Sequence, residues 1–151
     1  MFWIIRFIVD WTVWIIFADK SRWREIMPVC IFSSWASYIV EAIMTHYQLW
    51  SYTGNHLLAL NINGFGCYIV ATYLFIQWLP ADPLPKKMFF YWCCWTGFVI
   101  IFEWFHVWMG HMQYFKWWNI GWSYLSDWFL FWLFYKYYQV FSMVNSAKSK
   151  L

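Results

Sequence analysis

Residues 88–109 read MFFYWCCWTGFVIIFEWFHVWM, an apolar run that decides the fold class. A helix needs about 20 mainly apolar residues to cross a hydrocarbon core of roughly 30 Å. Only helices and closed barrels satisfy their backbone groups in lipid, and this run is continuous rather than alternating, which favours a helix. The stretch therefore predicts a transmembrane helix.

Four further apolar runs occur in the chain of 151 residues. Together they predict five spans, at about 2–18, 26–44, 57–79, 88–109 and 120–141, followed by a polar cytoplasmic tail at 142–151. We therefore expect one all-α domain, a polytopic membrane protein built as a bundle of five transmembrane helices. Gly64 and Gly66 lie within the third span, where they predict close approach of neighbouring helices.

The composition agrees with this class. Hydrophobic residues make up 64% of the chain and charged residues 11%, whereas soluble domains have about 45–50% apolar and about 25% charged residues. Disorder is excluded because it requires low hydrophobicity. The net charge of +3 is too small to indicate a nucleic-acid partner. The expected partner is the lipid bilayer, and no GxxxG motif indicates a homo-oligomer or a protein partner.

The basic residues predict the orientation, since Lys and Arg concentrate on the cytoplasmic side. Five spans place the first loop, the third loop and the C-terminus on one side, and the opposite side has only Lys116 outside the spans. The first group comprises Lys20, Arg22, Arg24, Lys86, Lys87, Lys136, Lys148 and Lys150. We therefore expect the N-terminus outside and the C-terminus in the cytoplasm of a cell-membrane, multi-pass protein.

Polar residues within the spans fall in the outer half of the predicted bundle. This candidate polar cluster consists of Arg6, Asp10, Glu41, Asn61, Glu103, His106 and Asp127. Polar faces turn away from lipid, so we expect these side chains to converge inside the bundle. One guanidinium cannot offset four carboxylates, so some must be protonated, bind a cation or reach external water.

Glu103 and His106 form an ExxH pair, whose spacing places both side chains on one face of a helix. In di-iron helical bundles such pairs bind metal, so both residues are candidate ligands of a divalent metal. Two other interpretations stay open: a hydrogen-bonded polar core that fixes the helix register, or a pocket open to solvent. No GxSxG, HExxH, P-loop or GxGxxG motif identifies catalytic residues.

The sequence thus predicts an integral membrane protein of unknown activity, serving as an accessory, a sensor, or a binder of a small ligand or cation. The alternative is a membrane-embedded enzyme or transporter that uses the Glu, His and Asp cluster, with or without a metal.

Four segments carry a resemblance to known proteins: ADKSRWREI (18–26), YIVATYLFIQWLP (68–80), EWFHVWMGHM (103–112) and WWNIGWSYLSDW (117–128). They resemble a family of small, Trp-rich, multi-pass membrane proteins from spore-forming bacteria that has no assigned activity. The resemblance extends over nearly the whole chain and implies membrane localisation and topology, without any catalytic residue.

Overall fold

The computed structural model describes residues 2–82 and 84–148, with side chains to residue 142, and is 80% helical with five helices. These are α1 (Phe2–Phe17), α2 (Trp23–His46), a third helix formed by α3, η2 and α4, α5 (Pro85–Trp108) and α6 (Ile120–Lys148). The third helix runs through α3 (His56–Ile62), a π-helical turn η2 (Asn63–Tyr68) and α4 (Ile69–Gln77). A short 3-10 helix, η1 (Lys20–Arg22), precedes α2.

The five helices lie at the five apolar runs, with one difference at the C-terminal end. Helix α6 continues through 142–148, which the sequence analysis placed in a polar tail beyond the last span. Residues 149–151 lie outside the described residues. The helix extends because its polar C-terminal part contains no glycine or proline to end it.

Local sequence signals set several helix boundaries. The Asn55 side chain accepts a hydrogen bond from the Leu58 N–H at 3.0 Å and caps α3. Asn119 does the same for α6, accepting from the Gly121 N–H at 2.9 Å. Helix α5 begins at Pro85, and Gly110 follows its end with a φ of +72°, the left-handed conformation that glycine adopts most easily.

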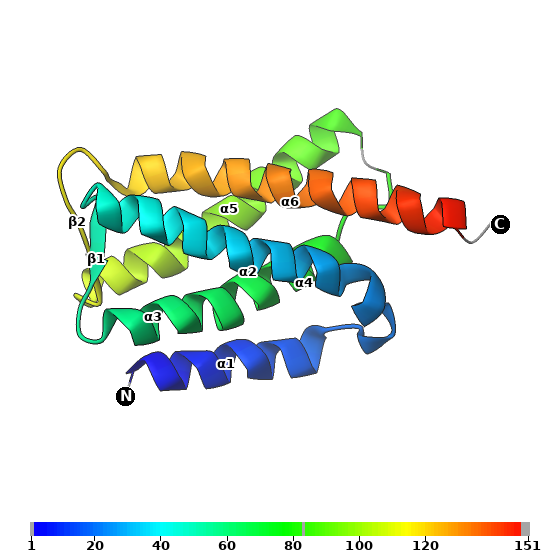
Figure 1. Cartoon of the computed structure of the whole chain (residues 1–151). Coiled ribbons are helices and arrows are strands. Elements are labelled where there is room, and N and C mark those ends of the chain that lie inside the picture. Colours follow the sequence, from blue (N-terminus) through cyan, green and yellow to red (C-terminus); the bar gives the residue numbers. More distant parts are fainter. Residues whose placement is uncertain (1, 83, 149–151) are drawn as a thin grey trace.

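A two-stranded antiparallel ribbon adds to the expected all-α fold. Strand β1 (Trp50–Tyr52) lies between α2 and α3, and β2 (Met112–Tyr114) lies between α5 and α6. Trp50 pairs with Tyr114 and Tyr52 with Met112. The ribbon joins two connections at one end of the bundle, which also holds the start of α1 (Figure 1). We call this the strand end.

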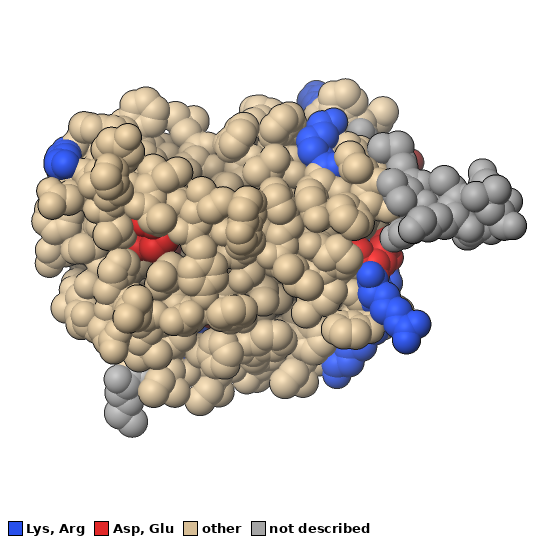
Figure 2. Space-filling model, viewed as in Figure 1, with Lys and Arg blue, Asp and Glu red and all other residues tan. Residues whose placement is uncertain are grey.

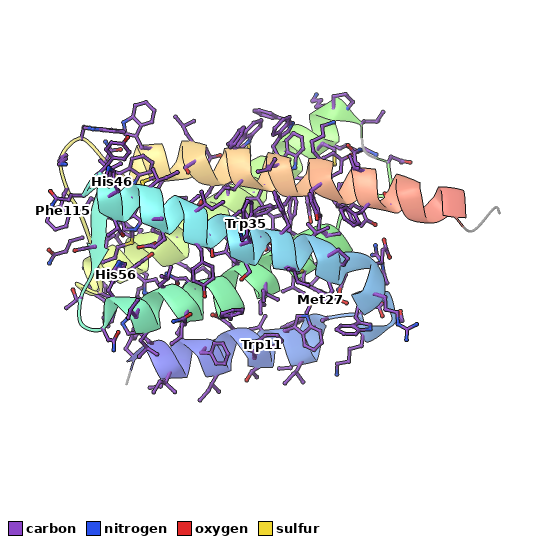
Figure 3. The ribbon with its side chains drawn as sticks, in the orientation of Figure 1. Trp11, Met27, Trp35, His46, His56 and Phe115 are labelled. Carbon is purple, nitrogen blue, oxygen red and sulfur yellow. The ribbon has the colours of Figure 1, made fainter. Side chains whose placement is uncertain are left out.

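The opposite end holds the α1–α2 turn, the α4–α5 connection and the end of α6 (Figure 1). Lysine and arginine gather there on the face shown in Figure 2. We call this the basic end. The arrangement agrees with the two groups of loops that the sequence analysis placed on opposite sides.

The core is built around α4, which packs against α2 and α6. Tyr73, Phe75 and Ile76 are fully buried there. Elsewhere large apolar side chains face outward, among them Ile31, Trp35, Ile101 and Trp104. Among the described residues, three helices are long and apolar enough to cross a membrane: Lys20–His46, His56–Gln77 and Pro85–Trp108.

Candidate functional site

Glu41 is held beneath the ribbon at the strand end. The Trp50 Nε1–H donates to both of its carboxylate oxygens, at 3.1 and 3.2 Å, and the Tyr52 O–H donates at 3.3 Å. His56 Nε2 lies 3.8 Å from Oε1. Only 7% of the Glu41 side chain is exposed, so β1 covers a buried carboxylate with neutral hydrogen-bond donors.

Glu103 on α5 has the equivalent contact with the second strand, because the Tyr114 O–H donates to its Oε1. Burial raises the pKa of Tyr114, and the neighbouring Glu103 carboxylate raises it further. Burial, with a smaller contribution from Glu41, also raises the pKa of Tyr52 well above its ordinary value. Both tyrosines therefore stay protonated and donate to the carboxylates at neutral pH.

Asp127 on α6 differs from both glutamates. It is half-buried and lies close enough to Glu103 for their charges to interact. Within the described side chains, Asp127 forms neither a hydrogen bond nor an ion pair. The ribbon supplies no donor to Asp127, nor to Asp10, whose buried Oδ2 has no hydrogen-bond partner among the described residues and lies 4.0 Å from Arg6 Nε.

Helix α1 contributes Arg6 and Asp10, four residues apart as predicted, with Nε and Oδ2 separated by 4.0 Å. The Asp10 carboxylate packs on the π-helical turn, since a Cβ added at Gly66 would lie 3.0 Å from Oδ2. A Cβ at Gly64 would lie 2.8 Å from a ring carbon of Tyr38 on α2. The predicted close approach at these two glycines is confirmed.

His106 lies at the same end in an aromatic setting and is 9% exposed. Its ring meets Phe2 edge-on at a centroid distance of 5.3 Å, and Phe2 stacks on His111 at 3.7 Å. The Nδ1 atoms of both histidines are buried and have no hydrogen-bond partner among the described residues. The last turn of α5 is thus packed against the start of α1.

Asn61 is not part of this interior, contrary to the prediction. It is exposed, accepts a hydrogen bond from the Tyr38 O–H at 2.8 Å, and donates back to the Leu57 carbonyl at 2.8 Å. These two bonds satisfy the amide on the outer face of α3, so it does not need the bundle interior. In its place, Asn63 donates to the Tyr52 hydroxyl oxygen at 2.9 Å.

The metal hypothesis for Glu103 and His106 gains no support. Within residues 2–82 and 84–148, no group of three or more His, Cys, Asp or Glu side chains is arranged to hold a metal ion. Glu103 is occupied by Tyr114, and His106 is packed among aromatic rings. The ExxH spacing places the pair on one helix face but assembles no further ligands around it.

The tyrosine and tryptophan donors were missed by sequence reasoning. The available signal was the alternation of large apolar or aromatic residues with polar ones in WSY (50–52) and MQY (112–114). Their burial follows it, since Trp50 and Tyr52 are half-buried while Ser51 between them is exposed. In a chain so rich in aromatics, three alternating residues are a weak signal.

Comparison with known proteins finds no family model, no curated protein and no solved structure that matches this chain. The resemblance to the Trp-rich membrane family therefore stays a prediction.

Proposed function

We propose that this chain is a five-span membrane protein with its strand end outside and its basic end in the cytoplasm. Three helices long and apolar enough to cross a membrane support the proposal. The described lysines and arginines also support it, because all of them except Arg6, within α1, and Lys116 belong to the elements of the basic end. Helices α1 and α6 supply the other two spans.

The orientation is tested by cysteine accessibility in intact cells, using a chain whose four native cysteines are replaced by serine. Ser51 and Lys86 are exposed at opposite ends. We expect Ser51→Cys to react with a membrane-impermeant reagent and Lys86→Cys to react only after the cells are opened. The reverse pattern would overturn the orientation.

Within this frame we propose that the outer, strand end binds a small cation. The observation that carries the proposal is the state of Asp127, a half-buried carboxylate without a donor beside a second carboxylate, Glu103. A charge inside a bilayer costs roughly 2.5–3.5 kcal/mol on insertion scales. A bound cation between the two carboxylates offsets that penalty and removes their mutual repulsion.

The chemistry favours a monovalent cation or a small protonated amine. The available oxygens are two carboxylates and the hydroxyl of Tyr114, which are too few for the shell of about six to eight oxygens that Ca²⁺ takes, so a singly charged ion suits the site better.

The test is the thermal unfolding midpoint of the purified protein in detergent, measured during titration with sodium, potassium and choline chlorides. A ligand that binds only the folded state stabilises it by about 2.7 kcal/mol at 100 times its dissociation constant. We expect one of these cations to raise the midpoint in wild type and to have no effect in Asp127→Asn. Asp82→Asn, at the basic end, is the matched control and should respond as wild type.

The same substitution has a second expected effect. Without a bound cation, the wild-type protein holds an unpaired Asp127 carboxylate, and Asp127→Asn replaces this charge with a neutral amide. Asp127→Asn should therefore be at least as stable as wild type in a buffer that contains none of the three cations. If no cation shifts the wild-type midpoint, or if Asp127→Asn responds equally, cation binding at this site is wrong.

A purely structural role is the second candidate, and the hydrogen bonds from the ribbon favour it. Glu41 and Glu103 anchor both strands, so the acidic residues of an accessory protein could serve only to hold its outer cap. In that case Glu41→Gln and Glu103→Gln loosen the ribbon, while Asp127→Asn leaves every cation response unchanged.

A further inference from the structure

A cleft of about 230 Å³ lies at the basic end, remote from the acidic cluster. The end of α4, the α4–α5 connection and the start of α5 form one side, and α6 and η1 form the other. Met88, Leu79 and Ile76 make its apolar wall, and Arg22, Tyr138 and Gln139 are among its polar lining residues.

Arg22 is fixed in this cleft by its neighbours. Its Nε and Nη2 donate to Glu25, both at 3.0 Å, Nη1 donates to the Gln77 carbonyl at 3.2 Å, and Nη2 also donates to the Tyr138 hydroxyl. A guanidinium has five N–H donors. These four contacts leave one N–H on Nη1 for a further acceptor.

The surroundings of the cleft are positively charged. Lys86 and Lys87 directly precede Met88, and Lys136 lies beside Tyr135 and donates to Gln139 at 3.3 Å. In the described part of this end, basic side chains outnumber acidic ones. The basic residues are Lys20, Arg22, Arg24, Lys86, Lys87 and Lys136, and the acidic ones are Asp19, Glu25 and Asp82. Glu25 pairs with Arg22 at 3.0 Å and Asp82 pairs with Lys87 at 3.4 Å, so Lys86 and Lys136 supply most of the attraction for an anion.

We propose that this cleft binds the headgroup of an anionic phospholipid of the cytoplasmic leaflet. Basic pockets between helices on the cytoplasmic side of membrane proteins suit such headgroups. The phosphate accepts from the free N–H of Arg22 and faces the lysines, while the glycerol and first acyl carbons lie on Met88 and Leu79. The proposal rests on the proposed orientation, which places the basic end at that leaflet.

The test is native mass spectrometry of the whole chain in non-ionic detergent with equal amounts of phosphatidylglycerol and phosphatidylcholine. We expect one phosphatidylglycerol per chain, retained at least tenfold over phosphatidylcholine. Ala81 is exposed and lines the cleft, so Ala81→Trp should fill it and abolish retention. The double variant K86Q/K87Q leaves the cleft open and should weaken retention by roughly fivefold per lysine.

Lys116→Gln is the matched control, because it removes a lysine at the strand end, and it should retain lipid as wild type does. Equal retention of both lipids, unchanged retention in Ala81→Trp, or displacement by millimolar inorganic phosphate would each overturn the proposal. The detergent experiment reports on the cleft alone, whereas Lys86→Cys accessibility reports on orientation. If Ala81→Trp abolishes lipid retention but Lys86→Cys is labelled from outside the cell, the cleft binds the lipid and the assignment to the cytoplasmic leaflet is wrong.

Discussion

Each end of the bundle holds a glutamate against a tyrosine hydroxyl, but the two glutamates are neutralised in different ways. At the basic end, Glu25 accepts from Tyr138 and also pairs with Arg22 at 3.0 Å. The two charged side chains are 37% and 33% exposed, so water screens the pair.

At the strand end, Glu41 is 7% exposed and its hydrogen bonds come from neutral Trp50 and Tyr52. Among the described side chains, no guanidinium pairs with it, and His56 Nε2 lies 3.8 Å away. The contrast indicates that the basic end is built to compensate charge locally, whereas the strand end keeps an excess of negative charge under a cover of neutral donors. Substitutions at each end test this difference.

The largest effect is expected for Glu41→Ala. It removes the acceptor of two donors, and net hydrogen bonds to a charged group contribute about 1.5–3 kcal/mol each. We expect a loss of about 2–4 kcal/mol in the free energy of unfolding, measured by SDS titration of protein in detergent micelles. Glu41→Gln keeps an acceptor oxygen and should lose less. An alanine variant within 0.5 kcal/mol of wild type would show that the ribbon does not depend on this carboxylate.

Gly64→Ala is expected to come next, because it separates α2 from the π-helical turn that carries Asn63 below the ribbon. The added Cβ would lie 2.8 Å from the Tyr38 ring and 3.2 Å from the buried Ser37 Oγ; because the half-buried Tyr38 ring can shift, we expect a cost near the lower end of the range of about 1–3 kcal/mol for overpacking. Gly97→Ala is the control, since a Cβ there meets nothing within 4 Å and alanine favours the helix. The same SDS titration should show opposite signs for the two variants, and equal signs would contradict the close approach.

At the basic end, Glu25→Ala should cost less than Glu41→Ala. Its ion pair with Arg22 is partly exposed, and exposed pairs contribute about 0.2–1 kcal/mol. With the loss of the Tyr138 contact, we expect about 1 kcal/mol in the same titration, and the loss should shrink at high salt. A loss as large as that of Glu41→Ala would remove the distinction between the two ends.

The helices and the separation of charge could be predicted from the sequence, because both follow from local runs of residues. Five apolar runs correspond to five helices, and Arg6 and Asp10 lie close together because residues four apart share a helix face. The two glycines lie together in one helix, although the side chains that pack on them, Asp10 and Tyr38, come from α1 and α2. For the helices and for the Arg6–Asp10 pair, the signal and its consequence lie within a few residues of each other.

The ribbon could not be predicted in the same way, because its two strands are about 60 residues apart and only three residues long each. Pairing at that distance depends on how the helices bring their connections together. The donors of the site, Trp50, Tyr52 and Tyr114, are part of this pairing and were missed with it. Asn61 failed for a related reason, since its partner Tyr38 lies on α2, and the sequence alone does not distinguish an amide satisfied on the outer face from a buried one.

The smallest effect is expected for Ser21→Ala, which acts on Asp19 in the turn before α2. This substitution tests an exposed carboxylate against the buried ones. The Ser21 O–H and N–H donate to Oδ1, at 2.6 and 3.0 Å, and lower the pKa of Asp19 below its ordinary value. Because the pKa of Asp19 is lower in the folded chain than in the unfolded chain, the ionised carboxylate stabilises the folded chain. This stabilisation is complete above about pH 4, the pKa of Asp in the unfolded chain, and is lost as the pH falls through the pKa in the folded chain. Ser21→Ala should therefore lower the thermal midpoint slightly at pH 7, and the difference in midpoint from wild type should narrow as the pH falls below about 4.

The control is Ser51→Ala, at an exposed position whose side chain forms no hydrogen bond among the described residues. It should show the same small difference in midpoint from wild type at every pH. A gap for Ser21→Ala that widens in acid would mean that the hydroxyl stabilises the protonated rather than the ionised carboxyl group.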